Sequence, residues 1–286
     1  MSYRSRDLLR ECLRSVAETV REHSYEVIVA DNDSRDGTEE MLAAEFASVR
    51  RIQMGTNAGF ARANNRALRE ADGRCLLLLN PDTVVRPGAL DALARFLEER
   101  ADVGVVAPQL LNADLTDQGT ARAFPTPAAF VFGRRSPLTR LFPGNPWSRR
   151  YLTGRARHGG EPFPVDWVSG ACLMTRRDIL DRVGGLDERF FMYWEDADWC
   201  RRVKQHGHGV FCLPAAQVVH DEGGTRRRSP ARQVWIFHQS VFWYYRKHYS
   251  HAPWNIIRPV VAAALAARAV AVIMANAVAS RAGGAR

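Results

Sequence analysis

The 286-residue sequence predicts an α/β protein with a mixed, mostly parallel sheet flanked by helices, followed by a helical C-terminal tail. Two observations in its first half support this class: short apolar runs alternate with segments of helical period, and polar motifs follow the apolar runs. A third observation is the aromatic and Ala/Val-rich composition after residue 229. We therefore divide the chain into an α/β domain, residues 1–225, and a helical, membrane-associating region, residues 226–286.

The first half alternates helices and strands as a sheet covered by helices does. Ser5 can cap a first helix, whose apolar residues recur at the 3.6-residue period, and a buried strand then ends at Asp31. The elements expected in this half after the first helix are strand 25–30, helix 59–71, strand 75–79, helix 88–100 and strand 103–107.

Residues 111–164 interrupt this alternation with prolines, aromatics and arginines, and we interpret them as a functional excursion and not as a linker. Regular structure is then expected to resume. The elements expected after the excursion are strand 171–175, helix 176–183, an acidic helix 196–206, strands 210–213 and 216–219, and a helix from Pro230 through His248. An apolar stretch over residues 259–279 ends the chain.

Composition restricts the class of protein. The chain is 46% hydrophobic and 25% charged, as ordinary globular proteins are, and its formal charge of +9 comes mainly from arginine. Much of that arginine lies in residues 134–157 and 226–258, which indicates an anionic partner such as phosphates, nucleic acid or an anionic membrane surface. Single cysteines without CxxC spacing indicate neither a zinc site nor a disulfide framework, and no signal peptide is expected.

The apolar stretch 259–279 is about long enough to span a bilayer. Arg268 and Asn276 interrupt it, and alanine contributes little to insertion. Three interpretations stay open: a membrane span, a helix lying at the interface, and a helix packed on the core.

The most informative motif places three carboxylates, Glu195, Asp196 and Asp198, among aromatic residues. Burying carboxylates costs several kcal/mol unless they are paired, bind a cation or take up a proton. We interpret one of them as a catalytic base. The alternative is that they form the acidic first turn of a helix, where the helix dipole favours negative charge.

Three further motifs follow strands, where open α/β sheets bind ligands. The run that starts Asp31-Asn32-Asp33 is either a donor-contacting motif or a simple turn. Asp82 follows a buried strand and could hold a divalent cation, with an Asx-type turn as the alternative. His220 ends a late strand and is either a metal ligand or a structural histidine.

Together these residues resemble the inverting glycosyltransferases of family 2, which have the GT-A fold, and within them the rhamnosyltransferase-like branch. The resemblance covers nearly the whole α/β domain. The motifs that carry it, in family order, are Asp31-Asn32-Asp33-Ser34-Arg35-Asp36-Gly37-Thr38, Asn57-Ala58-Gly59-Phe60-Ala61-Arg62-Ala63-Asn64-Asn65, Asn80-Pro81-Asp82, Val168-Ser169-Gly170-Ala171, and Gly185-Leu186-Asp187 through Glu195-Asp196-Ala197-Asp198, ending in His220.

The resemblance implies a role for each matching position. Asp196 would be the catalytic base, and Asp82 and His220 would bind Mg²⁺ or Mn²⁺. Asn80 stands where many relatives carry the first aspartate of the Asp-X-Asp motif, which leaves one negative charge fewer at the metal. The residues implied to bind the donor are Asp31, Asn32, Asn57, Gly59, Phe60, Asn64 and Asn80. Those implied to contact the acceptor or support the site are Glu195, Asp198 and Trp194.

The resemblance also implies the reaction: transfer of a sugar, expected to be L-rhamnose from dTDP-rhamnose, to a lipid-linked or polysaccharide acceptor at the cytoplasmic membrane face. UDP-galactofuranose, UDP-hexose and dTDP-hexose are the alternative donors. Because the base must be ionised to accept a proton, we expect a neighbouring cation or hydrogen bonds to offset its aromatic surroundings. Arg201, Arg202 and Arg176 are the candidates for that cation.

Relatives of this kind open with a buried strand before the helix that here begins near Ser5, and the sequence shows no such strand. The expectation is an upstream start or a truncated relative. Two other classes stay open: a catalytically silent membrane-associated assembly protein, and a sugar nucleotidyltransferase, which would release pyrophosphate instead of nucleoside diphosphate. Nucleic acid is not an expected partner, because no nucleic-acid-binding motif is present and the acids lie in the presumed cleft.

Overall fold

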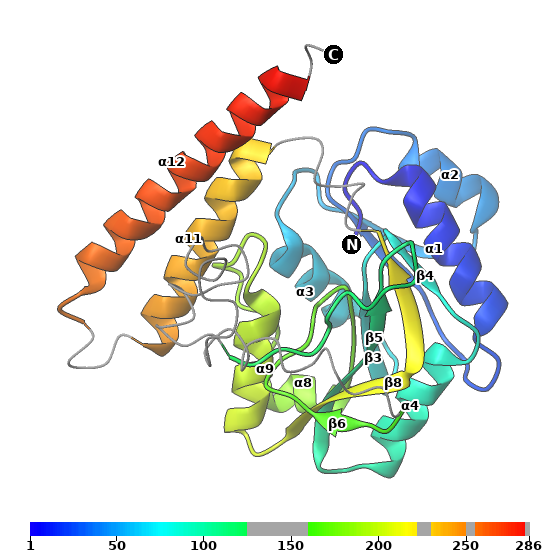
Figure 1. The fold of residues 1–286 in the computed structure, drawn as a ribbon. Helices are drawn as coiled ribbons and strands as arrows, with labels where there is room; N and C mark the ends of the chain where they lie inside the picture. The colour runs from blue at the N-terminus through cyan, green and yellow to red at the C-terminus, as the bar shows by residue number, and fades with distance from the viewer. Residues whose placement is uncertain (125–159, 222–229, 250–254, 284–286) are drawn as a thin grey trace.

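The structure is a computed structural model that describes residues 1–124, 160–221, 230–249 and 255–283 (Figure 1). Its helices are α1 (Arg6–Thr19), α2 (Thr38–Glu45), α3 (Phe60–Glu70), α4 (Ala89–Glu99), α8 (Arg177–Val183), α9 (Glu195–Gln205), α11 (Pro230–His248) and α12 (Arg258–Gly283). Its strands are β1 (Ile28–Asp31), β2 (Arg50–Gln53), β3 (Cys75–Leu79), β4 (Thr83–Val85), β5 (Val103–Leu111), β6 (Phe163–Pro164), β7 (Cys172–Arg176) and β8 (Gly209–His220).

The sheet is mixed, as predicted, but it is not mostly parallel. Its strand order is β3-β7-β5-β8-β4, with β6 beside β8, while β1 and β2 form a separate parallel pair. Within the larger sheet β5 and β8 are parallel, whereas β7 runs antiparallel to both β3 and β5, and β4 runs antiparallel to β8. Strand β7, which follows the excursion in the sequence, thus runs opposite to both of its neighbours, a direction that the sequence pattern does not indicate.

The strand expected to be missing before α1 is represented by one residue. Ser2 forms an isolated parallel bridge with Asp31, donating its N–H to the oxygen of Ala30 at 2.8 Å and accepting the N–H of Asn32 at 2.9 Å. Over the described ranges, no strand joins β1 to the larger sheet. The N-terminal residues therefore pair with the edge of β1 without extending into a full strand.

Helices cover both faces of the larger sheet. On one face, α3, α8 and α9 pack Leu68, Ile179 and Trp199 against the strands. On the other face, α1 and α4 contribute Val16 and Leu93 to a second apolar cluster. Both helical layers were expected, because their apolar residues recur at the helical period.

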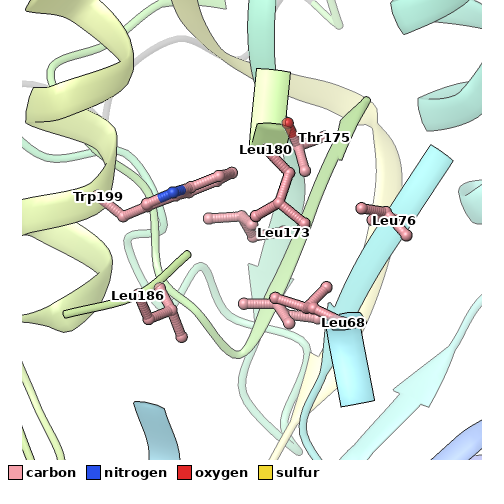
Figure 2. Close-up of a pocket in the computed structure, with 8 residues that line it drawn as sticks. Leu68, Leu76, Leu173, Thr175, Leu180, Leu186 and Trp199 are labelled. Carbon is pink, nitrogen blue, oxygen red and sulfur yellow. The ribbon is translucent and has the colours of Figure 1, made fainter. Parts of the chain in front are cut away.

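A small apolar cavity lies between the larger sheet and the layer formed by α3, α8 and α9 (Figure 2). Thr175 is the one polar side chain in its lining, which is otherwise leucine and tryptophan: Leu68, Leu76, Leu78, Leu173, Leu180, Leu186 and Trp199. A cavity with this lining lacks the polar groups that fix a nucleotide or a sugar, so we do not place the active site there.

The C-terminal helices α11 and α12 lie beside each other, to one side of the α/β unit (Figure 1). Helix α11 packs on the unit: Tyr244 is fully buried in the same apolar cluster as α9, and the Ser240 hydroxyl donates to the oxygen of Met192 at 2.8 Å. Helix α12 buries Leu265 and Ala269 but exposes other apolar side chains, including Val260 and Met274.

Two predicted elements differ from those observed. The predicted strand pair 210–213 and 216–219 is one strand, β8, which continues through Pro214 because the register with β5 shifts between Pro108 and Gln109. Strand β5 was predicted to end at residue 107 but extends to Leu111, where the excursion was expected to begin. Most of the excursion and the arginine run 226–228 lie outside the described residues.

Candidate active site

The polar motifs meet at one edge of the larger sheet. Strand β3 ends where β7 begins, with Leu79 opposite Cys172, and the N–H of Asn80 donates to the oxygen of Ala171 at 2.8 Å. Nearby, the β4–β8 pairing sets Thr83 opposite His220. The segment Asn80-Pro81-Asp82 thereby lies beside the start of β7 through β3 and is connected through β4 to the end of β8, as expected for a ligand site formed where strands end.

Asp196 is half-buried in the first turn of α9, after two residues with positive φ, Tyr193 (70°) and Trp194 (73°). Its Oδ2 accepts the N–H of Gly170 at 2.9 Å, and its Oδ1 accepts the N–H of Ala197 at 2.8 Å. Burial raises the pKa of Asp196 above its ordinary value, although the Gly170 N–H and the charge of Arg122 act against the shift. A carboxylate held by two amides, with a raised pKa, suits a general base.

Glu195 lies beside this base and is 5% exposed. Its Oε2 makes no hydrogen bond within the described part of the chain. Burial first, and then the charge of Asp196, raise the pKa of Glu195 well above its ordinary value. A buried carboxyl of this kind favours its protonated form, so Glu195 places little negative charge next to Asp196.

The predicted cation partners of the base are wrong. Arg202 pairs with Asp198 at 3.0 Å, Arg176 pairs with Asp178 at 3.1 Å, and the Arg201 guanidinium lies 4.8 Å from the centre of the Tyr249 ring. The positive charge that acts on Asp196 is Arg122, whose guanidinium lies 4.8 Å from the ring centre of Trp167. Closeness in the sequence misled the prediction. Arg201 and Arg202 lie in α9 with Asp196, but their side chains contact Tyr249 and Asp198 instead.

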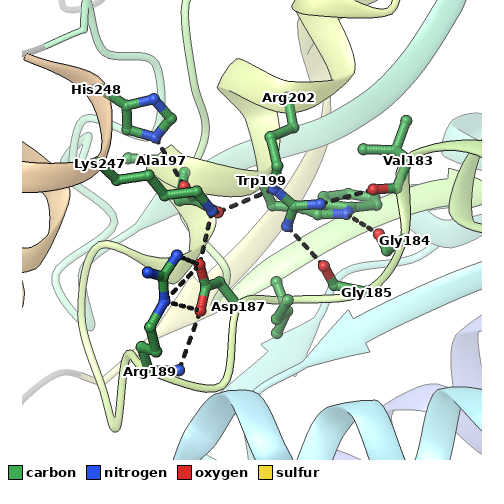
Figure 3. Close-up of polar contacts among 12 residues, drawn as sticks. Val183, Gly184, Gly185, Asp187, Arg189, Ala197, Trp199, Arg202, Lys247 and His248 are labelled. Atoms are coloured by element: carbon green, nitrogen blue, oxygen red, sulfur yellow. Dashed lines mark hydrogen bonds and ion pairs between the residues drawn. The ribbon is translucent and has the colours of Figure 1, made fainter. Parts of the chain in front are cut away.

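Asp198 is fully buried and joins α9 to α11 (Figure 3). Lys247 lies 2.7 Å from one of its oxygens, His248 lies 2.7 Å from the same oxygen, and Arg202 approaches the other. Burial acts to raise the pKa of Asp198, but the His248 hydrogen bond and the charges of Arg202 and Lys247 outweigh it and lower that pKa. These contacts favour the supporting role predicted for Asp198 over acceptor binding.

Trp194, also predicted to contact the acceptor or support the site, is buried among other rings. Its ring centre lies 6.2 Å from that of Trp167, 6.0 Å from Phe237 and 5.3 Å from Tyr244. Trp194 thus joins the strand region before β7 to α11, and it fixes the start of α9, where Asp196 lies.

Asp82 and His220 are both buried, and Asp82 Oδ1 lies 3.3 Å from His220 Nε2. A carboxylate oxygen and an imidazole nitrogen form a donor set that suits Mn²⁺, and Mg²⁺ less well. No group of three or more metal-ligating side chains occurs over the described ranges. The pair would suit a divalent cation only if further ligands came from outside these two side chains.

The predicted nucleoside contacts, Asp31 and Asn32, make well-defined internal contacts. The Asp31 carboxylate accepts hydrogen bonds from the Ser34 hydroxyl and, at 3.1 Å, from the Gln53 amide. These contacts are the ones expected if the motif is a simple turn. Asn32 is fully buried and joins β1 to the next motif, because its amide donates to the oxygen of Gly59 at 3.1 Å. Their contact with a donor stays a prediction.

The second predicted donor motif forms the start of α3. Gly59 has φ of 88°, and a Cβ there would lie 2.4 Å from the oxygen of Phe191, so only glycine fits. Asn57 accepts the Gly59 N–H at 3.2 Å, and the buried Asn64 donates to the oxygen of Phe60 at 3.0 Å. These contacts bring the motif against the segment that leads into α9, next to Asp196.

Sequence reasoning missed Gln118, Arg122, Lys247 and His248. The first two lie in the excursion, where no periodic pattern indicates which side chains turn inward. The last two lie in the last turn of the aromatic helix α11 and look like ordinary basic residues at a helix C-terminus. An unusual feature, a Lys-His pair within an otherwise aromatic segment, was the only available signal.

Comparisons with known proteins agree with the predicted resemblance. A family model described as glycosyl transferase family 2 matches residues 1–184. The chain is 31% identical to N-acetylglucosaminyl-diphospho-decaprenol L-rhamnosyltransferase of Mycobacterium tuberculosis, over 77% of this chain and 74% of the relative. It is 21% identical to dTDP-rhamnosyl transferase RfbF of Shigella flexneri, over 82% and 72% of the two chains.

Among solved structures, the mannosyltransferase PcManGT from Pyrobaculum calidifontis, in complex with GDP-Man and Mn²⁺, matches with a TM-score of 0.59 at 19% identity. The match covers 99% of this chain and 77% of that one. At this identity the likeness concerns the fold, which is the GT-A arrangement of a mixed sheet with flanking helices.

Proposed function

Because the chain belongs to glycosyltransferase family 2 and is rhamnosyltransferase-like, we propose that it transfers L-rhamnose from dTDP-rhamnose to a lipid-linked glycan, with inversion at the anomeric carbon. The observation that carries this proposal is Asp196, a half-buried carboxylate held by two amides beside the strand edge where the motifs meet. The names of both relatives support rhamnose as the sugar, and the name of the Mycobacterium tuberculosis relative supports a polyprenyl-diphosphate sugar as the acceptor.

Asp196 would accept the proton of an acceptor hydroxyl while that oxygen attacks the anomeric carbon of rhamnose. The bond from the anomeric carbon to the oxygen of dTDP breaks as the new glycosidic bond forms, so the products are the extended glycan and dTDP. The amides of Gly170 and Ala197 orient the carboxylate for this step. A single displacement inverts the configuration.

Asp82 and His220 would hold a divalent cation, Mn²⁺ or Mg²⁺, which when bound supplies positive charge that stabilises the departing diphosphate. The buried position of both side chains, 8% exposed each, keeps them in a fixed place at the sheet edge. With Asn80 in place of a second carboxylate, the protein would contribute one negative charge to the cation.

Calorimetric titration with dTDP-rhamnose tests the donor site. We expect binding that depends on Mn²⁺ and that falls below detection in Asp82→Ala. Asp72→Ala, which removes an exposed carboxylate elsewhere, is the control and should bind as the wild type does. Equal binding with and without Mn²⁺ would contradict metal-dependent donor binding, and tighter binding of another nucleotide sugar would contradict the assigned donor.

The proposed location is the cytoplasmic face of the membrane, where a polyprenyl-linked acceptor is found. In the described part of the chain, one helix, residues 258–277, is long and apolar enough to cross a bilayer, which is weak evidence by itself. Because α12 also packs along α11, we favour a helix lying at the interface, with its exposed apolar side chains in the lipid.

A further inference from the structure

Gln118 contacts His220 at two points. It lies in the turn that follows β5 and is 7% exposed. Its Nε2 donates to the main-chain oxygen of His220 at 2.9 Å, and its Oε1 lies 2.7 Å from the ring Nδ1 of the same residue. One side chain therefore holds both the backbone and the imidazole of the predicted metal ligand.

The contact with the backbone fixes the orientation of the Gln118 amide. A main-chain carbonyl oxygen can only accept hydrogen bonds, so the group that faces it must be the NH₂ group. The amide oxygen consequently faces Nδ1, and because that oxygen also only accepts, Nδ1 must carry a hydrogen. A neutral His220 ring then has its electron pair on Nε2, the nitrogen that lies 3.3 Å from Asp82 Oδ1.

A chain of hydrogen bonds leading outward from Gln118 requires the same orientation. Gln118 Nε2 also donates to Asn112 Oδ1 at 3.1 Å, and Asn112 Nδ2 donates to Thr116 Oγ1 at 2.9 Å. Thr116 Oγ1 in turn donates to Asp114 Oδ1 at 2.5 Å. A carboxylate only accepts, so the direction of every bond in the chain is determined from this end as well.

The backbone holds Gln118 in this place. The N–H of Gln118 donates to the oxygen of Leu110 at 2.9 Å, and Leu111 forms an antiparallel bridge with Asp117. The turn is thereby paired to β5, which is itself paired to β8 up to Val219, next to His220. The position of Gln118 relative to His220 is thus set by the sheet.

We propose that Gln118 is a positioning residue, which holds His220 as the Nδ1–H tautomer and aims the Nε2 electron pair at the space beside Asp82. For its role in the reaction this rests on the proposed metal-dependent function, whereas the tautomer is a property of the chain alone. A histidine that binds a metal must be neutral at the ligating nitrogen, and the partner of its other nitrogen fixes the ring.

Nitrogen NMR of the metal-free full chain, labelled with ¹⁵N-histidine, measures the tautomer directly. The His220→Asn spectrum assigns the signals, and the wild type should show a protonated Nδ1 and an unprotonated Nε2 when the ring is neutral. In Gln118→Leu the two tautomers should mix, whereas Gln118→Glu, which keeps an acceptor for Nδ1–H, should retain the wild-type form. A proton on Nε2 in the wild type, or an unchanged spectrum in Gln118→Leu, would overturn the proposal.

Electron paramagnetic resonance titration with Mn²⁺ measures the consequence. Loss of the partner of a ligating histidine typically weakens metal binding about 10–100-fold, which is the effect expected for Gln118→Leu, with partial recovery in Gln118→Glu. Equal Mn²⁺ affinity in Gln118→Leu and in the wild type would contradict the positioning role. If the wild type binds no Mn²⁺, the proposed metal dependence fails, and the nitrogen spectra still decide the role of Gln118.

Discussion

The two adjacent acidic residues at the start of α9 have different environments. Asp196 is half-buried and held by two amides, whereas Glu195 is buried with one oxygen that makes no hydrogen bond over the described ranges. Burial raises the pKa of both, and that of Glu195 well above its ordinary value. Burial thus favours the protonated form of Glu195, whereas the two amides that Asp196 accepts favour the ionised form that its proposed role as the base requires.

The raised pKa of Glu195 predicts that the Glu195→Gln variant gains unfolding free energy relative to the wild type as the pH rises. Because the folded-state pKa of Glu195 is raised, its contribution to stability is present below the unfolded pKa of about 4.3 and is lost as pH rises through the folded value. The glutamine avoids that loss, so the gain in unfolding free energy over wild type should grow by up to about 1.4 kcal/mol per pH unit between the two pKa values.

Urea unfolding between pH 4 and 8.5 measures this difference. Glu11→Gln, at an exposed position in the middle of α1, is the matched control and should change the unfolding free energy by less than about 0.5 kcal/mol throughout this range. A gain for Glu195→Gln that is largest in acid would show that Glu195 is ionised and stabilising in the folded protein.

Individual site residues were predictable only where a recognisable motif carries them. Asp196, Asp82 and His220 follow strands or start a helix within motifs of the family, so the sequence alone nominates them, and their roles stay predictions. Gln118 and Arg122 lie in an irregular segment, and their inward orientation depends on pairing with β5 and with Trp167, which are distant in the sequence. Local patterns carry no information about such contacts.

At the scale of elements, α9, which carries the proposed base, is fixed by a buried ion-pair cluster. Lys247 of α11 lies 2.7 Å from both Asp187 and Asp198, and Arg202 holds Asp198 from within α9 (Figure 3). Burial acts to raise the pKa of Asp187, but hydrogen bonds from Arg189 and Lys247 outweigh it and lower that pKa. The pKa of Asp198 is lowered in the same way by its own basic partners. The C-terminal region thus positions the helix that carries the base.

Lys247→Met should therefore destabilise the protein by about 3 kcal/mol near neutral pH, because breaking one partner of a buried ion pair leaves the carboxylates undercompensated. Asp187 and Asp198 both have lowered pKa values in the folded protein. The stability that their ion pairs with Lys247 contribute is therefore present above the unfolded pKa of about 3.9 and is lost as the pH falls through the folded pKa values. The difference between variant and wild type should shrink in acid.

The matched control is Arg246→Met, which removes the same charge from the neighbouring, exposed position of α11. Its unfolding free energy, measured in urea at pH 7, should lie within about 0.5 kcal/mol of the wild type. If Lys247→Met also falls within that range, the cluster does not hold α11 on the domain.

Most elements were predictable because strands and helices here follow their hydrophobic period closely, as α4 and β3 do. Strand direction was not, because β7 returns after an excursion whose path the sequence pattern does not reveal. The continuity of β8 through Pro214 was also missed, since the strand carries three extra residues, 214–216, between the pairings Leu213–Pro108 and Gln217–Gln109 and still continues as one strand.

At the scale of the whole molecule, exposed apolar side chains gather on α12, beside a unit that carries the catalytic motifs. Val260 is 67% exposed, Val270 50% and Met274 63%. Together with the net charge of +9, these side chains fit the proposed adsorption to an anionic bilayer, where the proposed lipid-linked acceptor would lie. The α/β unit and the tail would then act on one substrate from the same surface.

Substituting both Val260 and Met274 by aspartate should weaken binding to vesicles that contain anionic phosphatidylglycerol. Each lost apolar side chain is worth about 1.5 kcal/mol of burial, so affinity measured by vesicle sedimentation should fall at least about tenfold. Leu115→Asp, at an exposed apolar position of the α/β unit, should bind as the wild type does. Equal vesicle affinity in the double variant would exclude α12 as the membrane contact.

The most direct test of the central claim is the initial rate of rhamnose transfer from labelled dTDP-rhamnose to polyprenyl-diphosphate N-acetylglucosamine, in the wild type and in Asp196→Asn. Loss of the base should lower the rate about 10²–10⁴-fold, with dTDP as the released product and with donor binding and folding retained. A wild-type rate in Asp196→Asn, or the release of pyrophosphate, would contradict the assignment of Asp196 as the base of an inverting glycosyltransferase.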